Sequence, residues 1–451
     1  MTPTPAIAIF DVGKTNKKLF LFDEQYRIVF EKTLQFAETV DEDGDPCENL
    51  EALTEWGTNS IKELIALGEF DIKALNFSAY GASFVHIDAK GKTITPLYNY
   101  LKPFPDDLKK KFYSDYGGEI PVSMVTASPV LGNLNSGMQL YWLKYKQPKI
   151  FKKIKYSLHL PQYLSYLITG QSYSDITSIG CHTNLWNFPQ HNYHEWVLRE
   201  GVADKLPPVF SSADVVDARA FWKDFKVGIG LHDSSSALIP YLACFSEPFV
   251  LISTGTWCIT LNPFNNTPLT EDELKQDCLC YMSYRGEPVK ASRLFAGNEH
   301  EIETKRLAAH FNTAANHYKN VEYDIKIITA LTGKDPKAPA IKFGERNLSD
   351  YQDYETAYHR LILDIMWQQL ASTKLVIQED KVNRIFVDGG FSKNSIYMHL
   401  LAEAFPQMEV YAASVAQATA VGAALAIHKH WNSKPLPGDI IDLKFYAKPS
   451  I

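Results

Sequence analysis

The chain has 451 residues, of which 45% are apolar and 22% are charged, and its net charge is −7 at pH 7. These values are typical of a folded protein with a sizeable core and two or three domains. The negative charge disfavours nucleic acid as the main partner, because proteins that neutralise phosphates usually carry a basic surplus.

The sequence gives no sign of export or of membrane insertion. The start, MTPTPAIAIFDVG, has no basic segment before its apolar run, and no apolar stretch approaches the roughly 20 residues that span a bilayer. The six cysteines are too few for a disulfide scaffold, so we expect reduced thiols in a cytoplasmic protein. The pairs His191/His194 and His428/His430 lack a further ligand at zinc spacing, and we do not expect zinc there.

The first predicted element is a β-hairpin over residues 6–23, whose apolar halves flank the polar turn Asp11–Asn16. A glycine-centred turn can bind phosphate through backbone N–H groups. The Thr15 hydroxyl could then hold a terminal phosphate, Lys14 or Lys18 could add positive charge, and Asp11 could hold Mg²⁺. An ordinary hairpin with solvated lysines is the alternative that these residues alone leave open.

Further along the chain, residues 72–98 predict two strands joined at Gly81, followed by a turn at residues 90–92. Residues 135–154 and 157–170 have helical spacing, and the second segment ends on Gly170. Two apparent nucleotide motifs are incomplete. Residues 91–93 lack the first glycine of a P-loop, and residues 228–233 lack the last glycine of a dinucleotide fingerprint.

His232 and Asp233 end a predicted strand and precede a helix of small residues, DSSSA. An aspartate at such a junction is commonly a helix N-cap. It can also be a general base that accepts the proton of a sugar hydroxyl. The sequence alone leaves both interpretations open.

A second hairpin, over residues 247–264, repeats the form of the first, and Gly255 lies 242 positions after Gly13 (255 − 13). This repetition suggests two similar halves that face each other across a cleft, although chance similarity is the alternative. Buried hydroxyls need partners, so the threonines beside Gly255 would bind phosphate or backbone carbonyls.

The last third predicts a long helix over residues 354–377 and then a strand, a double-glycine turn and a helix from about Asn394. Asn394 could bind a nucleotide base or cap the helix. Residues 417–431 predict a helix of small residues suited to close packing, and residues 432–451 predict a surface loop. We place the domain boundary near residues 242–249.

Taken together and in chain order, these segments resemble the FGGY carbohydrate kinases, a branch of the actin-like ATPase superfamily. DVGKTN and STGTW resemble the two phosphate motifs, GLHDSSSA the catalytic turn, and VDGGFSKNSIYMHLLAEAF the adenosine motif. LITG with the following YSDITSIG resembles the helical signature and the segment after it, and QATAVGAALAI resembles the closing helix. The match extends over nearly the whole chain.

The resemblance implies an α/β fold in which two actin-like (ribonuclease H-like) domains, residues 1–245 and 246–451, flank a central cleft for ATP and sugar. It implies Asp233 as general base, Asp11 as ligand of Mg²⁺, and a sugar site at Tyr80, Gly81, Ala82, His232 and Asp233. The implied nucleotide-binding residues are Gly13, Thr15, Asn16, Lys18, Gly255, Thr256, Gly389, Gly390 and Asn394.

Three departures from the family pattern leave the sugar open. Residues 138–142 lack the usual lysine, Gln417 replaces a frequent glutamate, and residues 79–82 with Tyr98–Tyr100 replace the usual sugar-loop motifs. His232-Asp233 and the glutamine of MQLYW resemble the rhamnulokinase branch most. The expected function is therefore ATP-dependent phosphorylation of a ketose of the rhamnulose, fuculose, xylulose or ribulose type.

Two other function classes are weighed against the kinase. A non-catalytic sugar sensor with a vestigial ATP site should have lost the base or a phosphate motif, yet Asp233, Thr15 and Thr256 are present. A chaperone-like ATPase would need a separate peptide-binding region, for which too little chain remains. The expected partners are thus a sugar and ATP, without nucleic acid or membrane, and a homodimer stays open.

Overall fold

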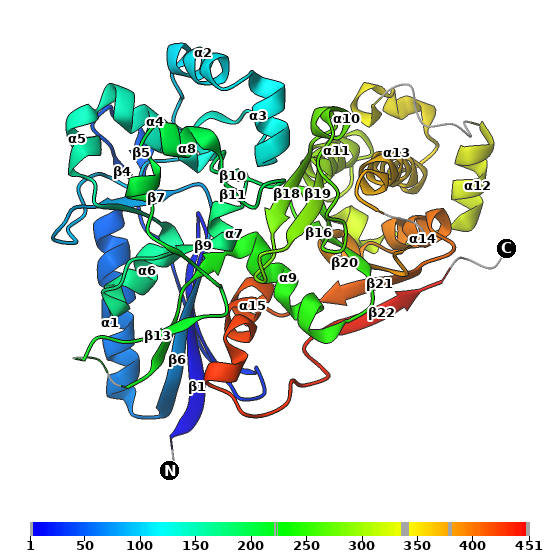
Figure 1. Cartoon of the computed structure of the whole chain (residues 1–451). Coiled ribbons are helices and arrows are strands. Elements are labelled where there is room, and N and C mark those ends of the chain that lie inside the picture. Colours follow the sequence, from blue (N-terminus) through cyan, green and yellow to red (C-terminus); the bar gives the residue numbers. More distant parts are fainter. Residues whose placement is uncertain (1–2, 221, 223, 335–341, 378–380, 448–451) are drawn as a thin grey trace.

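The computed structural model describes residues 3–220, 222, 224–334, 342–377 and 381–447. Each half of the chain builds a mixed β-sheet (Figure 1). The first sheet has the order β13 (Val215–Asp217), β14 (Lys226–Gly228), β6 (Phe70–Ala79), β1 (Thr4–Val12), β2 (Lys17–Asp23), β3 (Ile28–Leu34), and β15 (Leu231–His232) also pairs with β6. The second has the order β18 (Cys278–Met282), β19 (Pro288–Leu294), β17 (Cys258–Asn262), β16 (Phe249–Thr254), β20 (Arg384–Gly389), β21 (Glu409–Ser414), β22 (Asp442–Tyr446).

The two sheets share one topology. β1 is antiparallel to β2 and parallel to β6, and β16 is likewise antiparallel to β17 and parallel to β20. The turns at Gly13 and Gly255 therefore occupy equivalent places, as the repetition in the sequence predicts. Among the described residues, β18 has no equivalent in the first sheet, because it adds a strand beyond β19.

The central strands are apolar on both sides because helices cover both faces of each sheet. In β1, Ile7 and Ile9 face the middle of the molecule, whereas Ala8 and Phe10 face outward. The outer face packs on α1 (Leu50–Leu67) and α6 (Leu160–Thr169), and the Phe10 ring meets Trp56 of α1 with ring centroids 5.1 Å apart.

Two helices of small residues, α9 (Asp233–Cys244) and α15 (Ala418–Ala426), lie between the sheets (Figure 1). They cross where a Cβ on Gly422 would lie 1.8 Å from the Ser236 carbonyl oxygen, so this position admits only glycine. α15 comes from the end of the chain but packs on the first sheet, where Asn76 Nδ2 donates to the Ala423 carbonyl at 2.8 Å. The close packing predicted for residues 417–431 is confirmed.

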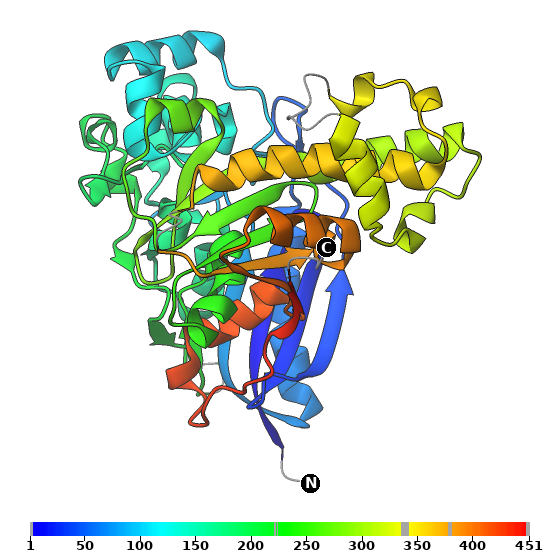
Figure 2. The same ribbon diagram turned by 90° about the vertical axis from the view of Figure 1, so that its right-hand side faces the viewer.

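The outer face of the second sheet is covered by α11 (Ala296–His310), α13 (Tyr354–Lys374) and α14 (Ser395–Ala404), with α12 (Ile325–Lys334) beside α13. Figure 2 shows α13 as a long helix running across this face. Its residues Leu361 and Ile365 share a core with Val250 and Ile252 of β16.

Shorter elements complete the fold. The remaining strands are β4 (Thr39–Val40), β5 (Pro46–Cys47), β7 (Phe84–Ile87), β8 (Tyr156–His159), β9 (Ser174–Asp175), β10 (Trp186–Asn187), β11 (Asn192–Tyr193) and β12 (Val209–Phe210). The remaining α-helices are α2 (Asp106–Asp115), α3 (Glu119–Thr126), α4 (Ser136–Lys146), α5 (Pro148–Lys153), α7 (Ile176–Ile179), α8 (Glu195–Arg199) and α10 (Glu271–Lys275). The 3₁₀ helices are η1 (Gly132–Leu134), η2 (Ala203–Lys205), η3 (His317–Asn320), η4 (Phe343–Glu345), η5 (Leu348–Asp350), η6 (Phe391–Lys393) and η7 (His428–His430).

Three local predictions need correction. The strands on either side of Gly81 lie in different sheets, because β6 pairs with β1 whereas β7 pairs with β8. Residues 157–159 belong to strand β8, and the predicted helix begins only at Leu160, beside Pro161. The C-terminal segment includes the edge strand β22, most of whose residues are exposed, so it lacks the buried pattern that predicts a strand. Residues 448–451 lie outside the described residues.

The described residues contain no helix that is long and apolar enough to cross a membrane.

Candidate active site

The first polar turn is closed by its own backbone. The Gly13 N–H donates to the Asn16 carbonyl at 2.9 Å, so this amide is not available to a phosphate. Thr15 and Asn16 are exposed at the tip, and Asn16 Oδ1 accepts from Gln35 Nε2 at 2.8 Å. Any phosphate at this turn would therefore meet the Thr15 hydroxyl and the amides that follow Gly13.

The carboxyl of Asp11, at the base of this turn, is held by the start of α15. Thr419 Oγ1 donates to Asp11 Oδ2 at 2.8 Å, and Lys18 Nζ donates to Gln417 Oε1 at 3.1 Å. Burial raises the pKa of Asp11 to about 6, and the nearby charge of Asp233 adds to this rise, whereas Thr419 and Lys18 oppose it. The structure thus brings Asp11, Lys18 and Asp233 close together.

Asp233 stands at the junction of β15 and α9. β15 runs parallel to β6 with His232 opposite Ala79, which places Asp233 beside the end of β6. The helix begins at Asp233 itself, and the carboxyl Oδ1 accepts the N–H of Ser234 at 2.6 Å. Asp233 is therefore the first residue of α9 rather than its N-cap, which weakens the cap interpretation. Burial raises the pKa of its carboxyl to about 6, against the two hydrogen bonds from Ser234.

The predicted sugar loop lies directly against His232. A Cβ on Gly81 would stand 2.9 Å from His232 Cδ2, so only glycine allows this contact. His232 Nε2 lies 3.2 Å from Asp233 Oδ1 and 3.2 Å from Cys181 Sγ. Burial lowers the pKa of His232 to about 4, so its imidazole is neutral at pH 7.

Tyr80 and Ala82 are fixed on either side of Gly81. The Tyr80 N–H donates to the Val12 carbonyl at 3.0 Å, which ties this loop to the first hairpin. Ala82 has a left-handed backbone (φ 62°), and its carbonyl accepts from Gln139 Nε2 at 2.7 Å. The structure therefore brings the predicted sugar-binding residues and Asp233 together.

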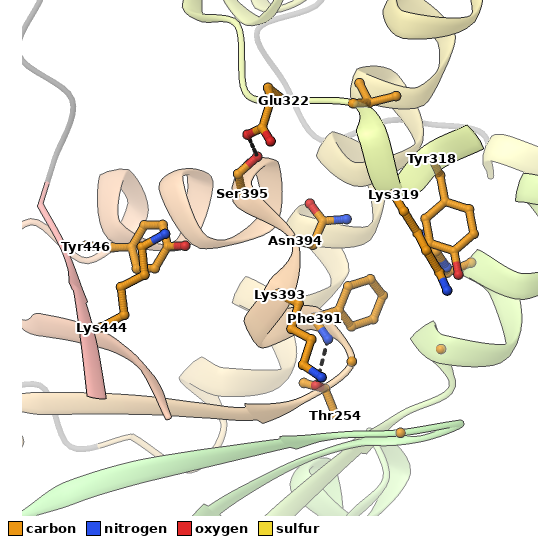
Figure 3. A pocket seen from close by; sticks show the side chains of 15 residues that line it. Thr254, Tyr318, Lys319, Glu322, Phe391, Lys393, Asn394, Ser395, Lys444 and Tyr446 are labelled. Carbon is orange, nitrogen blue, oxygen red and sulfur yellow. Dashed lines mark hydrogen bonds between the residues drawn. The ribbon is translucent and has the colours of Figure 1, made fainter. Parts of the chain in front are cut away.

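A cavity of about 620 Å³ lies in the second half, and its lining includes Gly255, Gly390 and Asn394 of the predicted nucleotide residues (Figure 3). In this view Tyr318 and Lys319 lie on one side of Asn394, and Lys444 and Tyr446 lie on the other. A cavity of this size is typical of sites for small molecules.

The second polar turn and the double-glycine turn form one unit at this cavity. The Thr254 carbonyl accepts from the Gly390 N–H at 2.8 Å, and Thr254 Oγ1 accepts from the Phe391 N–H at 3.0 Å (Figure 3). Gly389 has φ 93°, and a Cβ there would stand 2.0 Å from the Thr254 carbonyl oxygen. Both its conformation and this contact therefore require glycine.

Asn394 caps α14, because its Oδ1 accepts from the Tyr397 N–H at 3.0 Å. Its Nδ2 donates to the Tyr358 hydroxyl at 2.7 Å. The cap alternative is thus confirmed, and contact with a nucleotide base stays a prediction.

Sequence reasoning missed several residues of the site. Gly297, at the start of α11, lines the cavity, and a Cβ there would stand 1.8 Å from the Gly255 carbonyl oxygen. Tyr318 and Lys444 also line the cavity, and Thr419 holds Asp11. The Ala-Gly pair at the start of α11 indicates close packing and could have been used, whereas no sequence pattern indicates that Lys444, on an exposed strand, lines a cavity.

The structure does not gather every predicted nucleotide residue around the cavity. Gly13, Thr15, Asn16 and Lys18 belong to the first hairpin, and the cavity lining is drawn from residues 254–446. Thr256 and Gly389 adjoin lining residues without lining the cavity themselves.

The histidine pairs do not join a group of three metal ligands within the described ranges. The carboxylates of Asp41, Asp43 and Asp45 do cluster, but Lys102 Nζ lies 2.5, 2.7 and 3.1 Å from them and so forms an ion pair with each. All six cysteines are free thiols.

Comparison with known families fits this geometry. Residues 6–239 match the N-terminal domain of the FGGY family of carbohydrate kinases, and residues 246–435 match the carbohydrate kinase FGGY C-terminal domain. The chain belongs to the FGGY family of carbohydrate kinases.

Two curated relatives are similar to just over half of the chain. An L-fuculokinase of Salmonella typhi is 25% identical over 279 residues, which cover 56% of this chain and 56% of that protein. A rhamnulokinase of Halalkalibacterium halodurans is 24% identical over 265 residues, which cover 55% of this chain and 52% of that protein. The chain therefore spans little more than half the length of these relatives.

Solved structures match over nearly the full length. A carbohydrate kinase from Novosphingobium aromaticivorans has a TM-score of 0.80 at 21% identity, covering 99% of this chain and 95% of that chain. A xylulose kinase from Lactobacillus acidophilus has a TM-score of 0.78 at 17% identity, covering 98% of this chain and 94% of that chain. The FGGY protein thus has the predicted two-domain actin-like ATPase fold.

Proposed function

We propose that this FGGY protein phosphorylates a small sugar with ATP and that Asp233 is the general base. The observation that carries this proposal is the position of the Asp233 carboxyl, which lies beside the sugar loop at Gly81 and close to Asp11. A raised pKa of about 6 lets this carboxylate be ionised at pH 7 yet accept a proton.

The residues of the chain have separable roles in this proposal. Tyr80, Gly81, Ala82 and His232 orient the sugar hydroxyl toward Asp233, which takes its proton. ATP, when bound, supplies the phosphoryl group, and phosphoryl transfer depends on positioning and charge neutralisation. Thr15 and Asn16 on the first hairpin and Thr256 on the second would hold the phosphates, with Lys18 adding positive charge. The cavity at Gly255, Gly390 and Asn394 would hold the adenosine.

Asp11 would hold Mg²⁺, and the residues present fit this ion. Asp11 Oδ2 is engaged by Thr419, which leaves Oδ1 for a cation or for a water bound to it. Two carboxyls with raised pKa values, Asp11 and Asp233, lie near each other, and a divalent cation would relieve their repulsion.

The proposed substrate is a ketose of the rhamnulose, fuculose, xylulose or ribulose type. Relatives named L-fuculokinase and rhamnulokinase and a structural neighbour named xylulose kinase support this class. None of the relatives named above supports a sugar sensor without activity. A coupled assay of ADP release over a panel of ketoses, aldoses and polyols tests the proposal, which fails if no member of the panel releases ADP above the rate without sugar.

Three further expectations, on the domain bounds, the compartment and the oligomeric state, belong to the same proposal. We keep residues 1–245 and 246–451 as the two domains, supported by family matches that end at 239 and begin at 246. Six free thiols support a reducing compartment such as the cytoplasm. A homodimer stays a prediction that sedimentation would test.

A further inference from the structure

The extra strand β18 is buried although it forms the edge of its sheet. All five of its residues are buried, and its only strand partner in the described structure is β19. The free edge therefore faces protein rather than solvent. The strand contacts α10 of its own half, and its Met282 end meets the first half of the chain beside α7 and the start of α9.

Met282 makes this docking contact. Ser235 Oγ in α9 donates to the Met282 carbonyl at 2.8 Å. A Cβ on Gly180, just after α7, would stand 2.2 Å from Met282 Cγ. The end of β18 is thus fitted closely to the backbone beside the sugar site.

Tyr281, the neighbour of Met282, lies over the His232 ring. The two ring centroids are 6.0 Å apart and the planes differ by 14°, which is an offset stack. His182, beside Cys181, meets the same tyrosine edge-on at 6.2 Å. A residue of the second half therefore covers the imidazole that lies against Asp233.

His232 is held between the two halves. Gly81 supports the ring on the first-half side, Cys181 Sγ lies at its edge, and Tyr281 stacks on it from the second half. Within the described residues, His232 Nδ1 is buried and has no hydrogen-bond partner, so polar contacts fix only the Nε2 side of the ring. Stacking by Tyr281 must supply much of the remaining orientation.

We propose that Tyr281 is a positioning residue that fixes His232, and through it Asp233, whenever the two halves are in contact. The inference rests on the proposed function, because it assumes that Asp233 is the base. Its consequence is that the base is fully oriented only after β18 docks, so domain contact and proton transfer are coupled.

Steady-state kinetics of three variants test this coupling. Tyr281→Leu should lower kcat about 10- to 100-fold, because small displacements of catalytic groups have effects of this size. The KM for ATP should change less than about twofold, since the nucleotide cavity is separate from β18. Tyr281→Phe keeps the ring and should retain most of the activity. Tyr284→Leu, in the turn after β18, is the matched control and should behave like the parent.

The kinetic outcomes are distinguishable. A parent without sugar-dependent ADP release overturns the proposed function itself. An active parent with unchanged kcat in Tyr281→Leu overturns the positioning role. Equal losses in Tyr281→Phe and Tyr281→Leu also overturn it, because phenylalanine keeps the ring that stacks on His232.

The rate at which Cys181 is alkylated tests the proposal without relying on kinase activity. This thiol is buried beside His232, whereas Cys244 is exposed. Removal of the stack should speed labelling of Cys181 several-fold in Tyr281→Leu and leave Cys244 unchanged. Equal Cys181 rates in parent and variant would overturn the proposal. Rapid labelling of core Cys258 would reveal unfolding, in which case Tyr281→Met replaces the leucine variant.

Discussion

At the scale of single residues, the chemistry depends on the Asp233 carboxyl. Asp233→Asn keeps the size of the side chain and one oxygen but cannot accept a proton. We expect turnover to fall by about 10²–10⁴, the usual effect of losing a general base. Binding of ATP, measured by calorimetry, should stay near the parental value. If Asp233 only capped α9, asparagine would serve nearly as well, and near-parental turnover would contradict the assigned role.

The raised pKa of Asp233 also predicts the pH dependence of the rate. A base with a pKa of about 6 is protonated below that pH, so kcat/KM should rise as the pH increases through about 6 and then level off. Rates measured from pH 5 to pH 8 in buffers of constant ionic strength check this. A rate that is flat down to pH 5 would be inconsistent with a base of this pKa.

The same shift predicts a stability effect of the opposite sign. The folded-state pKa of about 6 exceeds the ordinary 3.8, so the folded protein binds the proton more tightly than the unfolded chain does. Stability contributed by this group is present below about pH 4 and is lost as the pH rises to about 6. Asp233→Asn should therefore unfold at the same or a higher temperature than the parent at pH 7, which thermal denaturation measures. A marked fall in Tm would show that the carboxylate stabilises the fold.

Gly81 tests the contact on the other face of His232. In Gly81→Ala the new methyl group would stand 2.9–3.0 Å from the ring, which must shift by a few tenths of an ångström. We expect kcat to fall about tenfold or more while ATP affinity is unchanged. Gly438→Ala, where nothing lies within 4 Å, is the control and should match the parent. A fully active Gly81→Ala variant would show that catalysis does not depend on the position of the His232 ring.

At the scale of elements, the sequence predicts those helices, strands and turns whose signal lies within one short stretch of the chain. The hairpins around Gly13 and Gly255 and the strand-turn-helix at Gly389 are confirmed, and the helix predicted over residues 354–377 is confirmed except that it ends at Lys374. Each of these signals lies within about 25 residues. The contact between Thr419 and Asp11 joins residues 408 positions apart and leaves no local pattern. Tyr281 was missed for the same reason, since nothing in β18 indicates that its edge will be buried.

The two hairpins yield a prediction about nucleotide binding. Thr15 and Thr256 are exposed at their tips, so replacing either hydroxyl should leave the fold intact. Thr15→Val and Thr256→Val should each weaken the handling of ATP, seen as a higher KM or a lower kcat. Thr33→Val, on the exposed strand β3 of the first sheet, is the matched control. Parental kinetics in both hairpin variants would contradict the assignment of Thr15 and Thr256 to the phosphates of ATP.

At the scale of the whole molecule, the two halves are joined through their middle layer and not only through one linker. α9 and α15 cross between the sheets, and each contacts elements of both halves. A second contact, through β18, lies near the sugar site. This arrangement suits a motion in which the middle layer persists while the β18 contact forms and breaks.

Such a motion predicts that the particle becomes more compact when ATP and sugar bind together. A transferred phosphoryl group must be kept from water, and closure of two domains around the substrates achieves this. Small-angle scattering of Asp233→Asn is the sharpest measurement, because this variant should bind both ligands without consuming them. Its radius of gyration should fall when both are present, and less with either alone. Tyr281→Leu, which lacks the stack on His232, should close less completely under the same conditions. An unchanged radius under saturating ligands would mean that the contact at β18 is permanent. Docking of β18 could then not control proton transfer, and the proposed coupling would be wrong.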